Sequence, residues 1–249
     1  MAKRYYAVLS LVALVAAWAL GAMVAGGRLF PGPLEVLSFV VAETASGALP
    51  WHLAITLWRV AAAFALAMVI GSAVGLAMGR SKATDRLLDP WLILFLNVPA
   101  LVVIILAYIW AGLTEVAAIA AVAINKIPNV VVTVREGARA LDTGLDDMAR
   151  AFRMSRAETL RHVTLPQLQP YFAAAARSGI ALIWKIVLVV ELLGRSNGVG
   201  FQLHLYFQLF DVTAILGYTL AFVAVMLVVE LGMVQPLERR ATRWRLKPA

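Results

Sequence analysis

The sequence predicts an all-α membrane protein with about six transmembrane helices. Of its 249 residues, 62% are hydrophobic and 14% are charged, and the mean hydropathy is +0.85. A soluble domain carries about 25% charged residues, which it needs to cover its surface. Several apolar stretches also reach the roughly 20 residues that one spanning helix requires. A lipid environment accounts for both observations, because lipid covers an apolar surface.

Six segments have the length and composition of a spanning helix. The first, 5–27, has no charged residue and follows Lys3 and Arg4. A cleavable signal peptide is the alternative, which the length of the apolar run disfavours. The other segments are 53–79, 90–110, 116–134, 171–193 and 212–234. Apolar residues also repeat at helical spacing within 34–43, which predicts a short amphipathic helix at the outer surface.

The distribution of basic residues predicts the orientation. Nearly all Lys and Arg fall in segments placed inside, and the outer segments hold only Arg28 and Arg195. By the positive-inside rule, both termini are expected to be cytoplasmic, in one multi-pass domain over 1–249 of a bacterial inner membrane. The net charge of +8 has the same explanation, so no nucleic-acid partner is expected.

The residue inventory offers little for catalysis. There is no cysteine, and the three histidines lie far apart, so neither a metal site nor a catalytic residue is expected. An intramembrane enzyme is the weakest alternative, because the spans lack aspartate. An independent secondary transporter or channel is the other alternative, but we find no strong internal repeat of the kind such folds contain.

The polar region 135–170 predicts a helical hairpin on the inner face. Residues 147–152 suit a short helix, and Ser155 followed by Glu158 forms a capping box. Two short helices with a break near residues 154–155 are therefore expected. Leu165-Pro166 is expected to end the second helix, because proline removes a backbone hydrogen bond. A rigid hairpin of this kind can insert into a groove on a soluble partner.

This hairpin resembles the "EAA" loop of permease subunits in bacterial ATP-binding-cassette (ABC) importers. That pattern is roughly Glu-Ala-Ala, a glycine a few residues later, and then Leu-Pro. The matching positions are Asp147 at the glutamate, Ala149 at the second alanine, Arg150 and Ser155 at positions commonly filled in this way, and Leu165 with Pro166 at the ending. The sequence departs from the pattern at Arg153, which replaces the glycine.

Most of the chain resembles the nitrate/sulfonate/taurine branch of these permeases. The similar stretches, in order, are 30–33 (FPGP), 52–60 (HLAITLWRV), 89–90, 99–100, 110–115 (WAGLTE), Glu191 and 196–200 (SNGVG). Lys126 departs from the branch, because a bulky apolar residue is usual there. The resemblance implies the architecture of a type I ABC importer permease.

The resemblance also implies partners. It implies a second permease subunit, usually a copy of the same chain, and two cytoplasmic ATP-binding subunits that hold the 147–166 loops. A periplasmic or lipoprotein substrate-binding protein would deliver a small solute of the anionic kind. ATP and Mg²⁺ would bind the partner ATPase, and this chain would hold no cofactor. Membrane lipid would surround the spans.

Two lysines, Lys126 and Lys185, lie near the middle of predicted spans. An isolated charge at the centre of a membrane helix costs roughly 2.5–3.5 kcal/mol or more, so each needs a partner or a watery cavity. One hypothesis is that they line the translocation path and attract an anion. The other is that they pair internally, for example with Glu191 or Glu230.

Other positions in the predicted spans carry hypotheses of their own. Asn97 and Trp184 are candidate substrate contacts, with helix packing as the alternative, and Glu191 suits either an outer gate or packing. Arg59 is expected to reach outward or to pair with an acid. The glycines Gly71, Gly75 and Gly79 have small-xxx-small spacing, which predicts a close helix contact within the chain or within a dimer.

Overall fold

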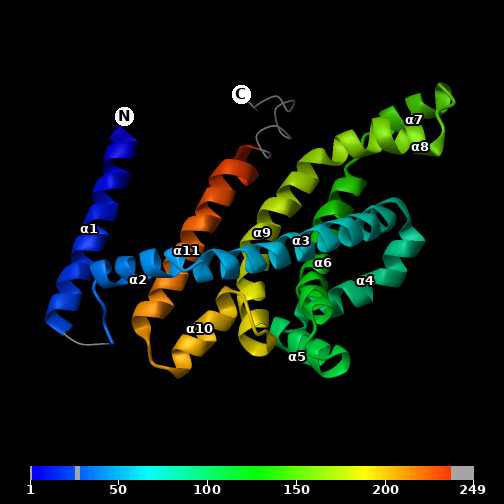
Figure 1. Cartoon of the computed structure of the whole chain (residues 1–249). Helices are drawn as coiled ribbons and strands as arrows, with labels where there is room; N and C mark the ends of the chain where they lie inside the picture. The colour runs from blue at the N-terminus through cyan, green and yellow to red at the C-terminus, as the bar shows by residue number, and fades with distance from the viewer. Residues whose placement is uncertain (1, 26–28, 237–249) are drawn as a thin grey trace. The chain divides into compact units, whose positions relative to one another are not determined.

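The computed structural model describes residues 2–25 and 29–236, which form helices and turns without a strand (Figure 1). The helices are α1 Ala2–Ala25, α2 Pro33–Ala45, α3 Ala48–Arg80, α4 Lys82–Asn97, α5 Ala100–Ala111, α6 Glu115–Arg139, α7 Thr143–Ala151, α8 Arg156–Thr159, α9 Leu165–Gly194, α10 Val199–Gln208 and α11 Val212–Val229. Two π-helical turns, η1 Leu160–Thr164 and η2 Glu230–Val234, join onto α9 and α11. The predicted all-α fold is confirmed.

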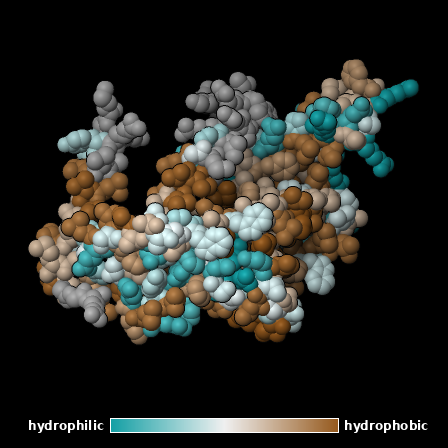
Figure 2. Space-filling model, in the orientation of Figure 1, coloured by the Kyte–Doolittle hydropathy of each residue, from teal (hydrophilic) through white to brown (hydrophobic). Residues whose placement is uncertain are grey.

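Four helical segments among the described residues are long and apolar enough to cross a bilayer. They are Ala48–Arg80, Glu115–Arg139, Arg156–Gly194 and Val212–Gly232. The bent pair of α4 and α5 would make a fifth crossing, and α1 supplies a shorter apolar helix over Leu9–Ala25. Figure 2 shows hydrophobic residues over much of the drawn face, as expected of a surface that lipid covers.

The third predicted span, 90–110, is a bent pair of helices and not one straight helix. α4 ends at Asn97, α5 begins at Ala100, and the two helices are bent by 97°. Val98 has ψ of 124° and Pro99 has ψ of 133°, so both residues are extended. The residue before a proline is driven out of the helical region by the proline ring, which explains the break.

The chain divides into two compact units. One comprises Met1–Leu57 with Glu191–Leu227, and the other comprises Trp58–Val190 with Val228–Ala249. The expectation of a single membrane domain stays a prediction.

In the second unit, α3 packs directly on α6. A Cβ atom at Gly71 would lie 2.6 Å from Val130 Cβ, and a Cβ at Gly75 would lie 2.8 Å from the Val131 carbonyl oxygen. A Cβ at Gly79 would overlap Ala138. The predicted small-xxx-small contact is confirmed, and it joins two helices of the same chain.

In the same unit, ion pairs join α6 to α4 and α3 to α7. Arg135 on α6 pairs with Asp89 on α4 at 2.6 Å, and Arg139 pairs with Asp85 at the same distance. Arg80, the last residue of α3, pairs with Asp146 on α7 at 2.7 Å. These pairs fix the base from which the α7–α8 hairpin projects.

In the first unit, α2 packs against α10 and α11 through aromatic rings. Phe39 lies edge-on to Tyr206, with ring centroids 5.9 Å apart, and a Cβ at Gly217 would meet the Phe39 ring. Tyr218 donates a hydrogen bond to Glu43 at 2.9 Å. The predicted helix over 34–43 is confirmed.

Candidate functional site: the α7–α8 hairpin and the buried polar residues

Helices α7 and α8 form a short hairpin that connects α6 to α9 (Figure 1). Figure 2 shows hydrophilic residues gathered at its tip. The break over residues 152–155 lies where the sequence predicts it. The capping box is also confirmed, because Glu158 N donates to Ser155 Oγ at 3.2 Å and Ser155 N donates to Glu158 Oε2 at 2.7 Å.

The turn after α7 explains why the importer pattern has glycine at the position of Arg153. Met154 N donates to Ala149 O at 2.9 Å, and Arg153 N donates to Arg150 O at 3.0 Å. This pair of bonds is the Schellman motif, which requires a left-handed residue directly after the helix end. Arg153 occupies that position with φ of +52°, so the turn forms although the residue is not glycine.

Replacing Arg153 with glycine is expected to raise the free energy of unfolding by about 0.5–1 kcal/mol. Left-handed strain costs a side-chain-bearing residue roughly 1–2 kcal/mol, which exceeds the entropic cost of glycine. Thermal unfolding in mild detergent measures the change. Arg153→Ala controls for the lost charge, and Arg150→Gly, inside α7, is expected to destabilise. Equal stability of the glycine and alanine variants would contradict the left-handed turn.

Leu165-Pro166 does not end a helix, and that prediction was wrong. The chain stays helical from Arg156 to Gly194, with η1 inserted before α9. Leu165 N reaches back five residues to Leu160 O. A π-turn shifts the bonding register, and Gln167 Nε2 donates to Val163 O at 3.1 Å. The helix thereby tolerates the missing N–H of Pro166.

The structure places five of the predicted coupling residues on this hairpin, whereas Leu165 and Pro166 lie at the start of α9. Asp147 and Arg150 are exposed, and Arg150 Nη1 lies 3.4 Å from Asp147 Oδ1, whereas Ala149 is buried. Arg153, Ser155, Leu165 and Pro166 are also exposed. Phe152, which the sequence did not single out, is 77% exposed at the tip. The sequence could have indicated this exposure, because an aromatic residue in a polar turn has no neighbouring apolar residues to bury it.

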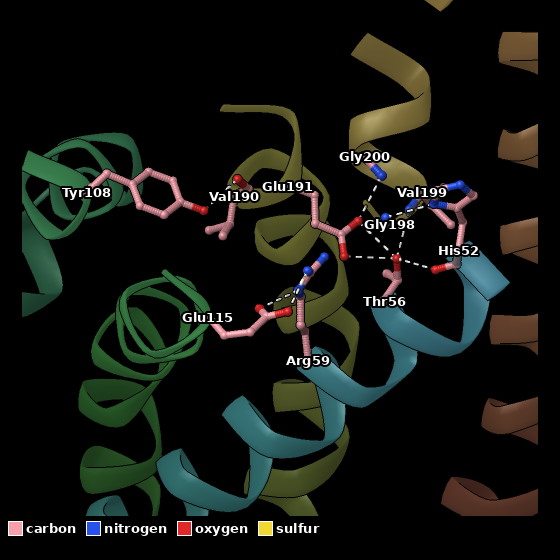
Figure 3. A network of polar contacts seen from close by, with 10 residues as sticks. All are labelled: His52, Thr56, Arg59, Tyr108, Glu115, Val190, Glu191, Gly198, Val199 and Gly200. Atoms are coloured by element: carbon pink, nitrogen blue, oxygen red, sulfur yellow. Dashed lines mark hydrogen bonds and ion pairs between the residues drawn. The ribbon is translucent and has the colours of Figure 1, made fainter. Parts of the chain in front are cut away.

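A second feature is a polar cluster around Glu191 in the first unit (Figure 3). The Glu191 side chain is fully buried. Its carboxylate accepts hydrogen bonds from Gly200 N at 2.8 Å and from Thr56 Oγ1 at 2.9 Å. Thr56 Oγ1 in turn accepts from Val199 N at 2.8 Å. The last turn of α9, the start of α10 and the first part of α3 are therefore joined.

His52 completes this cluster. Its Nδ1 atom accepts a hydrogen bond from Gly198 N at 3.0 Å, so the neutral ring carries its proton on Nε2. That atom lies 2.6 Å from the Gln202 side-chain amide, and the amide oxygen, Oε1, is the group that can accept its proton. Gly198 has φ of +105°, and a Cβ there would collide with the Glu191 carboxylate. The role of Glu191 as gate or packing residue stays a prediction, and the geometry supplies its packing partners.

The second unit holds an ion pair between a buried arginine and a partly exposed glutamate (Figure 3). Arg59 is 1% exposed and meets Glu115 through two bonds, Nε to Oε2 at 2.9 Å and Nη2 to Oε1 at 2.7 Å. Of the two expectations for Arg59, pairing with an acid is confirmed. Tyr108 donates to Val190 O at 2.9 Å in the same unit.

The remaining path candidates lie in different surroundings. Lys126 is buried at the middle of α6, whereas Lys185 on α9 is exposed. Asn97 is exposed at the end of α4, where its amide donates to Ile93 O at 2.8 Å. Trp184 is half-buried and donates to Ala181 O. Their roles in translocation stay predictions.

Residues 67–234 match the family model described as "Binding-protein-dependent transport system inner membrane component". The Bacillus subtilis protein that carries the name of an aliphatic sulfonates transport permease, SsuC, is 29% identical over 234 residues, covering 93% of this chain and 84% of that protein. The Escherichia coli protein of the same name is 32% identical over 192 residues, covering 76% and 73%. The E. coli taurine transport system permease protein TauC is 28% identical over 193 residues, covering 78% and 70%.

Solved structures share the fold. A chain of the MetNI methionine ABC transporter in an inward-facing conformation matches with a TM-score of 0.68 and 19% identity, covering 81% of this chain and 99% of that chain. A chain of an amino acid ABC transporter with histidines matches with a TM-score of 0.64 and 21% identity, covering 81% and 98%.

Proposed function

Since the chain belongs to the family of inner membrane components of binding-protein-dependent transport systems, and is a permease subunit of an ABC importer and not an enzyme, we propose that it carries a small anionic solute inward. The observation that carries this proposal is the family match over 67–234, together with the named relatives. Neither an independent secondary transporter nor an intramembrane enzyme is favoured by that membership.

The names of the relatives support an anionic solute. They specify aliphatic sulfonates, taurine and, in a Synechococcus elongatus permease that is 27% identical over 188 residues, bicarbonate. These solutes are chemically different, but each carries a small negatively charged oxygen group. We assign the same chemical class to the solute of this chain.

The α7–α8 hairpin is the proposed contact with the ATP-binding subunits. It presents the exposed Phe152 ring beside the charged Asp147 and Arg150 side chains. An apolar anchor within a charged rim is a common arrangement for a docking element. ATP and Mg²⁺ would be bound by the partner subunits, and a substrate-binding protein would deliver the solute on the opposite side. Two copies of the chain, with both termini cytoplasmic, would form the path.

A pull-down from native membranes in mild detergent, with mass spectrometry of the recovered partners, tests this function. The tagged chain is expected to recover an ATP-binding subunit. Asp147→Arg and Phe152→Asp are each expected to reduce that recovery at least about tenfold, because both change the exposed docking face. The matched control is Phe210→Asp, since Phe210 is 74% exposed and follows α10 instead of α7.

Two results would contradict the proposal. Recovery of this chain alone, under conditions that keep a known importer intact, would favour an independent transporter. An equal loss of partner with Phe210→Asp would show that the hairpin is not the specific contact.

A further inference from the structure

Lys126 is a buried cation without a counter-ion in the described part of the chain. Its side chain is 2% exposed, and it makes no hydrogen bond or ion pair with any residue of 2–25 or 29–236. Other buried or half-buried cations of the same unit are paired. Arg59 meets Glu115, and Arg135 meets both Asp85 and Asp89. The lysine is the exception that calls for an explanation.

The fold makes room for the Lys126 side chain. Lys126 lies eleven residues after the first residue of α6, Glu115, which places it about 16 Å along the helix. Gly179 on α9 faces it, because a Cβ at Gly179 would lie 3.1 Å from Lys126 Cε and 3.4 Å from the ring of Phe64. Any larger residue at position 179 would press on the lysine stem. The space is therefore matched to a long side chain.

The neighbouring helices have no spare carboxylate to neutralise this charge. α3, which carries Phe64, contains no Asp or Glu at all. On α6 the acids are Glu115 and Glu136, near the two ends, and both are ion-paired with arginines. On α9 the only acid is Glu191, whose carboxylate is bonded to Thr56 and Gly200. None of the acids on these three helices is paired with Lys126.

A largely buried ammonium without a counter-ion is less favourable for folding than an apolar group of the same size, because burial removes part of its hydration. Methionine has a similar length and would fill the same space. The protein thus retains a side chain that its own stability opposes. Such a conflict between stability and sequence is typical of a group that serves function.

We propose that Lys126 binds the anionic headgroup of the transported solute and thereby selects oxyanions over neutral solutes. The inference rests on the proposed function, which it deepens by naming a specificity-determining residue. A sulfonate, carboxylate or bicarbonate supplies the negative charge and the hydrogen-bond acceptors that an ammonium with three donors lacks here. Lys185 is exposed, and water or other surface groups can satisfy its charge.

The test uses the complete transporter, with its ATP-binding and substrate-binding subunits, in proteoliposomes. The probes are radiolabelled ethanesulfonate, taurine and bicarbonate. With whichever probe the wild type accumulates, Lys126→Met is expected to lower uptake at least about tenfold. The same variant is expected to unfold at a higher temperature than wild type and to retain its ATP-binding subunit. Lys126→Arg, which keeps the charge, is expected to retain most uptake.

Lys82→Met serves as the control, because Lys82 is an exposed lysine at the start of α4. It is expected to leave both uptake and stability unchanged. Unaltered uptake and KM in Lys126→Met would overturn the proposal. So would a lowered unfolding temperature or loss of the ATP-binding subunit, since either would make the lysine a structural residue. A wild type that recovers no ATP-binding subunit and accumulates no probe contradicts the proposed function itself.

Discussion

Replacing Gly75 with leucine is expected to lower the free energy of unfolding by about 3 kcal/mol, at the upper end of what overpacking costs. A Cβ at this position would lie 2.8 Å from the Val131 carbonyl oxygen and 3.0 Å from Val134 Cβ. The first of these atoms belongs to the backbone of α6 and cannot rotate away. The two helices would have to separate, and the packing along their shared length would be lost.

Thermal unfolding of the purified chain in mild detergent measures this effect, and Gly232→Leu is the matched control. A Cβ at Gly232 meets no atom within 4 Å, so leucine there is expected to change stability little. Gly75→Ala should fall between the two. If leucine at position 75 were tolerated as well as leucine at position 232, α3 and α6 would not be in the contact described here.

The same contact bears on function. α3 ends at Arg80, which pairs with Asp146 on the hairpin, and α6 leads directly into that hairpin. Separation of α3 from α6 would therefore move the proposed contact with the ATP-binding subunits. We expect Gly75→Leu to weaken ATPase recovery in the pull-down as well as stability.

Composition and local patterns were sufficient to predict the helical membrane fold. Long apolar runs indicate spans because lipid tolerates no unpaired backbone groups, and this constraint does not depend on distant residues. The capping box of Ser155 and Glu158 was also predictable, because its atoms lie within three residues. The glycine spacing on α3 predicted a helix contact, although not which helix would make it.

Local patterns were misleading where backbone geometry depends on context. Pro99 breaks a span that reads as continuous, whereas Pro166 fails to end a helix that the sequence predicts it will end. Pro90, Pro128 and Pro170 also lie inside helices, so proline alone does not end a helix, and directly before Pro166 the backbone forms a π-turn. No pattern of apolar residues reports that turn.

The buried polar clusters could not be predicted, because they join distant parts of the chain. Thr56 and Glu191 are 135 residues apart in sequence, and Arg59 and Glu115 are 56 apart. Resemblance to the importer branch marked the stretches 52–60 and 196–200 separately. Only the structure shows that Thr56 and Val199, one from each stretch, are bonded to each other.

Replacing Glu191 with alanine is expected to lower the free energy of unfolding by about 3 kcal/mol, since each unsatisfied buried donor costs roughly 1–3 kcal/mol. The buried Gly200 N–H would lose its acceptor, and the Thr56 hydroxyl would lose one of its two acceptors and keep His52 O. A cavity would also remain beside Gly198, whose backbone lies against the carboxylate. Thermal unfolding measures the total loss, and amide hydrogen exchange over 198–208 localises it.

Glu191→Gln is the control that separates charge from hydrogen bonding. Its amide oxygen can accept from Gly200 N, and its amide nitrogen can donate to Thr56, whose own hydroxyl then donates to His52 O at 3.0 Å. We expect this variant to lose about 1 kcal/mol or less. Faster exchange at the start of α10 in the alanine variant alone would assign Glu191 to the docking of that helix. Unchanged exchange and stability in both variants, with solute uptake abolished, would instead assign its charge to the gate.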